Sequence, residues 1–317
     1  MSISDDPSYK YVLGDSPKSK RTSPYFEFSN EDVEGFDPDE WRTSDSQTKS
    51  EPSSSTEPGP TTGSDIYTPS SGDIIIPDIT GDLKLDVSDW IILDGVRTKS
   101  GRDVAISPLG IFTDSYVNKN WSDQFSQAFS DGIVLATLPM LGVYLNSLIN
   151  VHNGNGTLRS ASKNPVPSDK IDHYFNDLLV PYSGKKAKGR SLDARFEINK
   201  QGKRTMFYNH RQRHSDLTPE TNSEIPDAIL DKDCYADISS LDELCLPHIK
   251  SGDNYQAGVS LKYWKVTNNG VCRFWSIEYY SNLNCNYNLD DNDPSLGVFC
   301  AASFSAGGAQ KKLGGSS

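Results

Sequence analysis

One uncharged stretch constrains the fold of this chain more than any other sequence feature. Residues 132–151 contain no Asp, Glu, Lys or Arg, although these four types make up 23% of the whole sequence. A helix of this length rises about 30 Å, which matches the hydrocarbon thickness of a bilayer. The stretch therefore predicts either a membrane span or a helix at the centre of a globular core.

The residues around this stretch give contradictory signals about a membrane span. Lys and Arg are concentrated after the stretch, which by the positive-inside rule places the C-terminal side in the cytoplasm. All five cysteines also follow the stretch. Disulfides persist in oxidising compartments, so the cysteines would instead place the C-terminal side outside the cytoplasm. Pro139 and Asn146 interrupt the apolar pattern. We therefore expect a buried helix over 132–151 that is kinked or begins near Pro139, with a single-span membrane protein as the alternative.

The first 72 residues have the composition of a disordered acidic arm. They contain 14 acidic and 6 basic residues, a net charge of −8, and much Ser, Thr and Pro. Such a segment cannot bury enough apolar surface to offset the conformational entropy lost on folding. The N-terminus also lacks the basic and apolar regions of a secretory signal peptide.

Within this arm, residues 25–41 combine aromatic side chains with carboxylates. Aromatic residues among acidic ones are typical of a segment that folds when it binds a protein partner. We predict a protein-binding site at 25–41. The alternative is an acidic spacer with incidental aromatic residues.

Residues 73–230 are predicted to form a mixed domain of strands and helices. Short apolar runs over 74–76, 83–87, 90–96 and 104–109 predict a small meander with turns at 94–95 and 99–101. Apolar residues at helical spacing predict helices over 120–129 and 169–180.

A basic hairpin is predicted over 185–214, a segment that contains ten basic and two acidic residues. Its expected basic surface consists of Lys185, Lys186, Lys188, Arg190, Arg195, Lys203, Arg204, Arg211 and Arg213. Such a surface could follow a phosphate backbone, but a net charge of −12 for the chain favours a solvated face or one that contacts acidic protein surface. His210 and His214 have the spacing of a metal pair, but they lack the central Glu and are surrounded by cations. We predict no metal site and no cofactor.

Residues 231–305 are predicted to form a small antiparallel β-module, followed by a flexible tail over 306–317. Asn269 and Gly270 lie between two β-rich runs, 259–266 and 271–280, which is a strong signal for a two-residue hairpin. A third strand is expected over 296–304. A meander of this kind would bring Cys272 within disulfide distance of Cys285 or Cys300, and Cys234 with Cys245 is the expected second pair. The alternative is five reduced thiols in a cytosolic protein.

The order of residues in this segment resembles the cysteine-pinned β-module at the C-terminal ends of many fungal extracellular proteins. The resemblance covers residues 259–304 and depends on Trp264, Gly270, Cys272, Phe274, Tyr280, Cys285, Gly297, Cys300 and Phe304. It implies an oxidised, disulfide-stapled module that has no catalytic residue of its own. It also implies an extracellular location, with a cytoplasmic or membrane location as the alternative. Asn120 and Asn155 begin glycosylation sequons that would be used only in the secretory pathway.

No sequence motif for catalysis accompanies these features: there is no nucleophile elbow, phosphate-binding loop, dinucleotide fingerprint or HExxH motif. We therefore expect an α+β protein with a non-catalytic binding or structural role, and nucleic acid is not the expected partner. The alternative is a hydrolase or toxin-like enzyme whose site is assembled from distant residues. A pocket that joins a His to an Asp or Glu would favour the enzyme, and a flat aromatic surface would favour the binding protein.

Overall fold

The computed structural model describes residues 73–213 and 216–304. The chain divides into two compact units, 1–62 and 63–317, and all described residues belong to the second unit. The predicted acidic arm, its segment 25–41 and the predicted tail lie outside the described residues.

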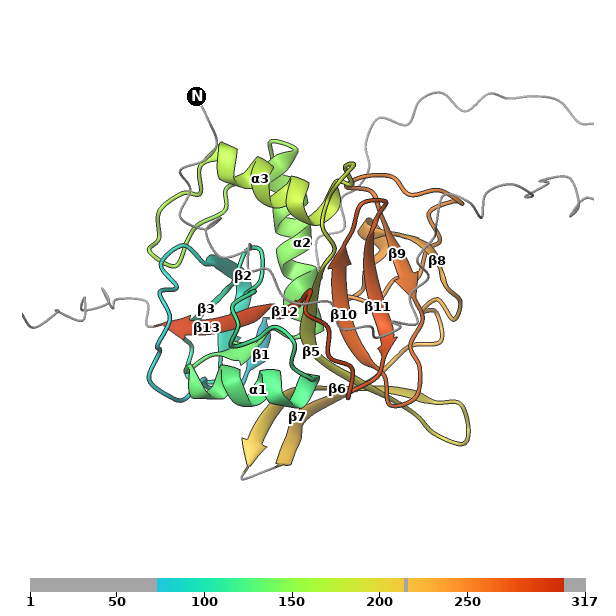
Figure 1. The fold of residues 1–317 in the computed structure, drawn as a ribbon, viewed down its shortest axis with the longest axis horizontal. Helices are drawn as coiled ribbons and strands as arrows, with labels where there is room; N and C mark the ends of the chain where they lie inside the picture. Colours follow the sequence, from blue (N-terminus) through green and yellow to red (C-terminus); the bar gives the residue numbers. More distant parts are fainter. Residues whose placement is uncertain (1–72, 214–215, 305–317) are drawn as a thin grey trace, which may run out of the picture. The chain divides into compact units, whose positions relative to one another are not determined.

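The described residues form two mixed sheets and three α-helices (Figure 1), so the predicted α+β class is confirmed, although strands dominate. The first sheet has the order β1-β2-β3-β13-β4, and the second has the order β7-β6-β5-β10-β11-β9-β8, with β12 beside β5. The first sheet contains β1 (Ile74–Ile76), β2 (Ile91–Thr98), β3 (Asp103–Ile106), β4 (Val134–Leu135) and β13 (Cys300–Phe304). The second contains β5 (Lys188–Ile198), β6 (Arg204–Arg213), β7 (Asp216–Glu224), β8 (Cys234–Asp237), β9 (Ser260–Trp264), β10 (Val271–Ser276), β11 (Ser281–Tyr287) and β12 (Leu296–Val298).

The uncharged stretch is divided between a strand and a helix. Helix α2 (Leu138–His152) begins after Thr137, whose hydroxyl accepts the backbone N–H of Met140, and Pro139 lies in the first turn, where a missing N–H costs nothing. The predicted buried helix is therefore confirmed from Leu138 onward and is wrong for 132–137, which contains β4. No described helix is long and apolar enough to cross a membrane.

The other two helices follow their predicted ranges closely. Helix α1 (Trp121–Ser130) is capped by Asn120, whose side-chain oxygen accepts the backbone N–H of Asp123. Helix α3 (Ser168–Leu179) packs against α2. Helix α2 also contacts strands of both sheets and lies between them in Figure 1, so its apolar residues form the centre of the main core.

The predicted meander is only partly correct. Strands β1 and β3 and the turn between β2 and β3 lie where they were expected. Residues 83–87 form no strand, and β2 continues through the predicted turn at 94–95. Gly95 has a φ of 78°, and the β2–β3 register shifts between Ile92 and Arg97, so the glycine forms an irregularity within a strand pair rather than a hairpin.

The predicted hairpin around Asn269 and Gly270 is wrong. Strand β9 pairs in parallel with β11, and β10 pairs with β11 and β5, so β11 lies between the two expected partners. The turn residues bind another strand instead: the N–H of Asn269 donates to the carbonyl of Phe196, and the N–H of Phe196 donates to the carbonyl of Gly270. A strong local turn signal is therefore compatible with long-range pairing that crosses over an intervening strand.

The C-terminal segment is not a separate antiparallel module. Strands β8 to β11 belong to the same sheet as β5 and β6, and β13 completes the first sheet by pairing with β3 and β4. Both sheets thus contain strands from both sides of residue 230. The described residues of the two predicted domains form one unit because neither part can complete its sheets alone.

Candidate functional site

A buried Asp–His pair lies where the ladder between β5 and β6 ends. His210 Nδ1 is 2.5 Å from Asp193 Oδ1, and the backbone N–H of His210 donates to Asp193 Oδ2 over 3.0 Å. Both side chains are 2% exposed. With Nδ1 donating to the carboxylate, Nε2 is the acceptor nitrogen, and it forms no hydrogen bond within the described residues. This arrangement orients an imidazole as a general base requires.

A left-handed residue produces this geometry. Arg195 pairs with Phe207, so a regular ladder would place Asp193 opposite Asn209. Asn209 instead has a φ of 55°, which Asn tolerates better than most residues, and the turn directs His210 toward the carboxylate. The strand register, counted outward from the hairpin turn, places Asp193 opposite Asn209 and therefore next to His210. This signal was present in the sequence, but it was not part of the prediction.

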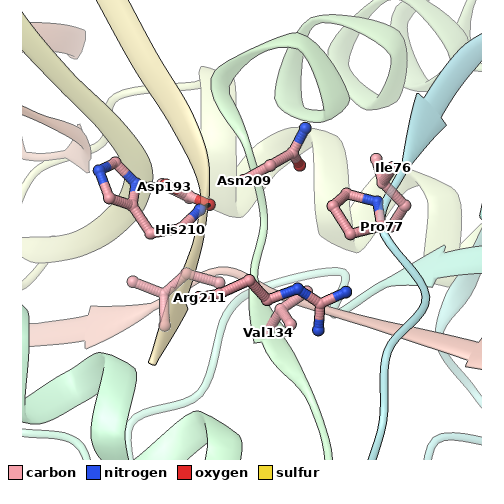
Figure 2. Close-up of a pocket in the computed structure, with 8 residues that line it drawn as sticks. Ile76, Pro77, Val134, Asp193, Asn209, His210 and Arg211 are labelled. Atoms are coloured by element: carbon pink, nitrogen blue, oxygen red, sulfur yellow. Dashed lines mark hydrogen bonds and ion pairs between the residues drawn. The ribbon is translucent and has the colours of Figure 1, made fainter. Parts of the chain in front are cut away.

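A small pocket borders this pair (Figure 2). Its polar lining is Asp193, Asn209, His210 and Arg211, and its apolar lining is Ile76, Pro77, Val134 and Leu135. None of these residues has a hydroxyl or thiol, so the lining provides no Ser, Thr, Tyr or Cys nucleophile. The rings of Trp121 and Phe125 lie edge to face with the imidazole at centroid distances of 5.1 and 5.7 Å, and they hold it in place.

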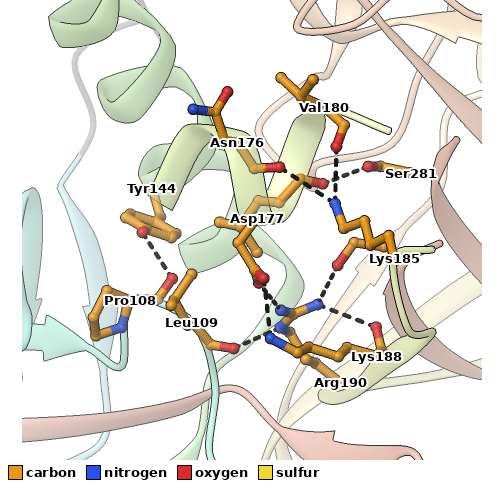
Figure 3. Close-up of polar contacts among 12 residues, drawn as sticks. Pro108, Leu109, Tyr144, Asn176, Asp177, Val180, Lys185, Lys188, Arg190 and Ser281 are labelled. Atoms are coloured by element: carbon orange, nitrogen blue, oxygen red, sulfur yellow. Dashed lines mark hydrogen bonds and ion pairs between the residues drawn. The ribbon is translucent and has the colours of Figure 1, made fainter. Parts of the chain in front are cut away.

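A second polar cluster joins α3 to β5 (Figure 3). Arg190 is fully buried, and its Nη2 is 2.8 Å from Asp177 Oδ2. The same guanidinium donates to the carbonyl of Leu109 and to the hydroxyl of Ser276. Burial would raise the pKa of Asp177, but Arg190 and then Lys188 hold that pKa below its ordinary value. Every one of these contacts is internal, so the cluster serves the fold.

The predicted basic surface is therefore only partly a surface. Arg190 is buried in this cluster, and Lys185 is also buried, with its Nζ donating to the carbonyls of Asn176 and Val180 at the end of α3. Burial lowers the pKa of Lys185 to about 8. The remaining seven residues of the predicted set are exposed or half-buried, and most form ion pairs or backbone contacts: Lys186, Lys188, Arg195, Lys203, Arg204, Arg211 and Arg213.

Aromatic residues gather on the outer side of the second sheet, around β8, β9 and the start of β11. We call this surface the aromatic face. Tyr235, Tyr255, Trp264 and Tyr280 form it through contacts with one another or with Lys262, and the exposed Tyr182 and Tyr279 lie in adjoining loops and are counted with it. The Tyr235 ring lies 6.3 Å from Tyr255 and 6.4 Å from Tyr280. Tyr279 is 72% exposed and Tyr182 is 54% exposed. The loops that carry these two residues meet, because the N–H of Gly184 donates to the carboxylate of Glu278.

A lysine lies beside two rings of this face. The ammonium of Lys262 is 4.8 Å from the Tyr235 ring centroid and 5.6 Å from that of Trp264. Lys262 is opposite Tyr235 on one neighbouring strand and opposite Asn282 on the other. The face was not predicted, because its residues come from five separate segments; only the alternation of Lys262 and Trp264 along β9 was visible in the sequence.

The described cysteines are all free thiols, so the expected disulfides are not formed. Cys272 and Cys285 come nearest to bonding, with their sulfur atoms 3.4 Å apart on neighbouring strands. The second expected pair is not brought together in the same way: Cys245 is buried, whereas Cys234 is half-exposed on β8. Cys300 lies in β13, in the other sheet and in the second core cluster.

The two glycosylation candidates differ in their surroundings. Asn155 is exposed, and Asn120 is half-buried as the cap of α1. No group of three or more His, Cys, Asp or Glu side chains suitable for a metal ion occurs within 73–213 and 216–304.

No protein-family model, curated protein or solved structure matches this chain. The resemblance of residues 259–304 to fungal extracellular modules therefore stays a prediction.

Proposed function

We propose that this chain is a non-catalytic binding protein and that the aromatic face is its recognition surface. The observation that carries this proposal is the position of Lys262, whose ammonium lies over the rings of Tyr235 and Trp264. No carboxylate of the described residues pairs with it. A cation held by rings but not by an anion is a group still available to a ligand.

The composition of the face also supports recognition. Tyr and Trp provide large contact areas at low cost in conformational entropy, and each keeps a polar atom for a hydrogen bond. Both residue types are enriched at protein interfaces. Exposed aromatic side chains beside such a cluster, here Tyr182 and Tyr279, often mark a site of interaction. The phenol of Tyr255 donates to the carbonyl of Leu179, which fixes one edge of the face on α3.

The first prediction concerns ligand binding by this face. The full chain, applied to arrays of peptides, glycans and oligonucleotides, is expected to retain at least one class of ligand. The double variant Tyr235→Ala, Trp264→Ala is expected to lose that ligand, because both rings that flank Lys262 are removed. Tyr208→Ala, which lies on β6 and outside the face, is the control and should keep it. If no ligand distinguishes the double variant from the control, the proposed recognition surface is wrong.

A hydrolase is the second candidate function, and the Asp193–His210 pair is the observation that favours it. The carboxylate fixes the imidazole through two hydrogen bonds, and Nε2 could accept a proton from water. The pocket lining offers no hydroxyl or thiol nucleophile and no second carboxylic acid beside Asp193. The hydrolase is therefore the weaker of the two candidates.

We also propose that Cys272 and Cys285 form a disulfide when the chain meets an oxidising compartment, which would accord with an extracellular location. Exchange with glutathione disulfide would join the two sulfur atoms and release two molecules of reduced glutathione. The 3.4 Å separation on paired strands makes this the favoured pair, and the β-bulge at Cys272 gives the backbone some freedom to approach.

The second prediction is a thiol count. Protein purified without reductant, then unfolded and alkylated, is expected to show three free thiols and one cross-linked peptide pair containing Cys272 and Cys285. Cys300→Ser is the control, and it should leave the cross-link intact. Alkylation of all five cysteines would contradict both the disulfide and the extracellular proposal.

A further inference from the structure

We infer that the ligand of the aromatic face is a short acidic peptide segment of a partner protein, in which a carboxylate binds Lys262 between aromatic or aliphatic residues. This inference rests on the proposed binding function and adds the chemistry of the partner.

The first step is the environment of Lys262, whose ammonium lies near two aromatic rings. Some described lysines, such as Lys84 and Lys265, have no carboxylate partner within 4.0 Å, and five others have one: Lys99, Lys170, Lys188, Lys203 and Lys250. Lys262 is half-buried and has none. Its ammonium lies 4.8 Å and 5.6 Å from the ring centroids of Tyr235 and Trp264, close enough for cation–π attraction. The position is therefore prepared for an anion that the described residues do not provide.

The second step is the neighbouring amide. Asn282 pairs directly with Lys262 and is 7% exposed, yet its Oδ1 is buried without a hydrogen-bond donor. Its Nδ2 also forms no hydrogen bond within the described residues. An amide that lacks hydrogen-bond partners is costly in a folded protein. A ligand on the face cannot reach the buried Oδ1, but an acceptor that binds the Nδ2 would gain affinity.

These two residues define what the ligand must carry. The ammonium of Lys262 and the Nδ2 of Asn282 are both donors, and together they suit a carboxylate. A peptide supplies such a carboxylate from Glu or Asp, together with neighbouring side chains that can pack on the rings of the face. A glycan can donate and accept but carries no charge in its neutral form, and a nucleic acid offers phosphates that normally require several cations.

The third step concerns charge. The whole chain has a net charge of −12, which opposes the approach of a strongly acidic tail. A single carboxylate that is flanked by apolar residues avoids most of this repulsion, and its flanking residues can pack on the rings of Tyr235, Tyr280 and Trp264. The structure therefore favours a segment in which one or two acids alternate with aromatic residues.

The third prediction tests this chemistry by calorimetric titration of the full chain with two synthetic peptides. One is acetyl-Gly-Trp-Glu-Phe-Glu-Trp-Gly-amide, and the other has both Glu replaced by Gln. The acidic peptide is expected to bind at least about tenfold more tightly than its neutral twin, which corresponds to roughly 1.4 kcal/mol for a charged contact between partly desolvated groups.

Three variants locate the effect. Lys262→Met keeps the stem but removes the charge, and it should reduce the affinity for the acidic peptide about tenfold while leaving the neutral twin unchanged. Asn282→Asp places a carboxylate beside Lys262 and should compete with the peptide to a similar extent. Lys265→Met, at an exposed lysine just beyond β9, is the matched control and should have little effect. Thermal unfolding of each variant shows whether it is folded.

The outcomes separate this inference from the proposed function. If both peptides, or a glycan, bind equally well and depend on Tyr235 and Trp264 but not on Lys262, the recognition surface stands and the acidic peptide is overturned. If an oligonucleotide binds in a Lys262-dependent way and the acidic peptide does not, the partner class is also overturned. If nothing binds in a way that depends on Tyr235 and Trp264, both proposals are wrong.

Discussion

Replacing Asp177 with Asn is expected to lower the free energy of unfolding by about 3–5 kcal/mol, because the substitution leaves the buried Arg190 guanidinium without its counter-charge. Arg190 is fully buried, and Asp177 is the only carboxylate within ion-pair distance of it among the described residues. Urea unfolding of the full chain, followed by circular dichroism, measures the change. The variant should unfold in one transition at a lower urea midpoint than the wild type.

Lys188→Met is the matched control for this substitution. Lys188 binds the other oxygen of the same carboxylate at 3.0 Å, but its side chain is 41% exposed. Water therefore compensates for much of its loss, and the expected cost is at most about 1 kcal/mol. Equal costs for the two variants would show that Arg190 does not depend on Asp177 in the way proposed here.

Gly132→Ala is also expected to destabilise the chain strongly. Gly132 has a φ of 72°, and a Cβ at this position would lie 2.4 Å from the backbone carbonyl oxygen of Asp82. A backbone atom cannot rotate away as a side chain can, so the clash adds to the left-handed strain. The combined cost is expected to be about 3 kcal/mol or more.

Gly101→Ala separates the two contributions to this cost. Gly101 has a φ of 77°, nearly the same as Gly132, but no atom lies within 4 Å of the position of its Cβ. Only the backbone strain remains, and it should cost about 1–2 kcal/mol. Urea midpoints of the two variants, measured together, give the steric part as their difference. If Gly101→Ala destabilises the chain as much as Gly132→Ala does, the close approach of Asp82 is not a determinant of stability.

The features that sequence predicted well are those with local causes. The amphipathic spacing of Trp121, Phe125 and Ala128 predicted α1, and Pro139 marked the start of α2. The hairpin of β5 and β6 followed from the turn at 199–203 and the alternation of its arms. In each of these elements, the predicted backbone hydrogen bonds join residues that lie a few positions apart along the chain or across a short turn. The local sequence pattern is therefore enough to predict the element.

The features that sequence missed have long-range causes. The parallel pairing of β9 with β11 depends on a chain that crosses over, and no local turn signal distinguishes this from a hairpin. Arg190 was assigned to a surface because a charged residue is usually exposed, and only the packing of α3 brings Asp177 to it. The aromatic face shares this difficulty, since Tyr182 and Tyr280 are almost a hundred residues apart along the chain.

The central claim is that ligand binding occurs on the aromatic face, and amide chemical-shift mapping of the full chain with the acidic peptide tests it most directly. The account predicts saturable shifts at Tyr235, Lys262 and Asn282, on β8, β9 and β11, with little change near the Asp193–His210 pair. Shifts confined to Asn209 and His210 would contradict the account and favour the hydrolase candidate.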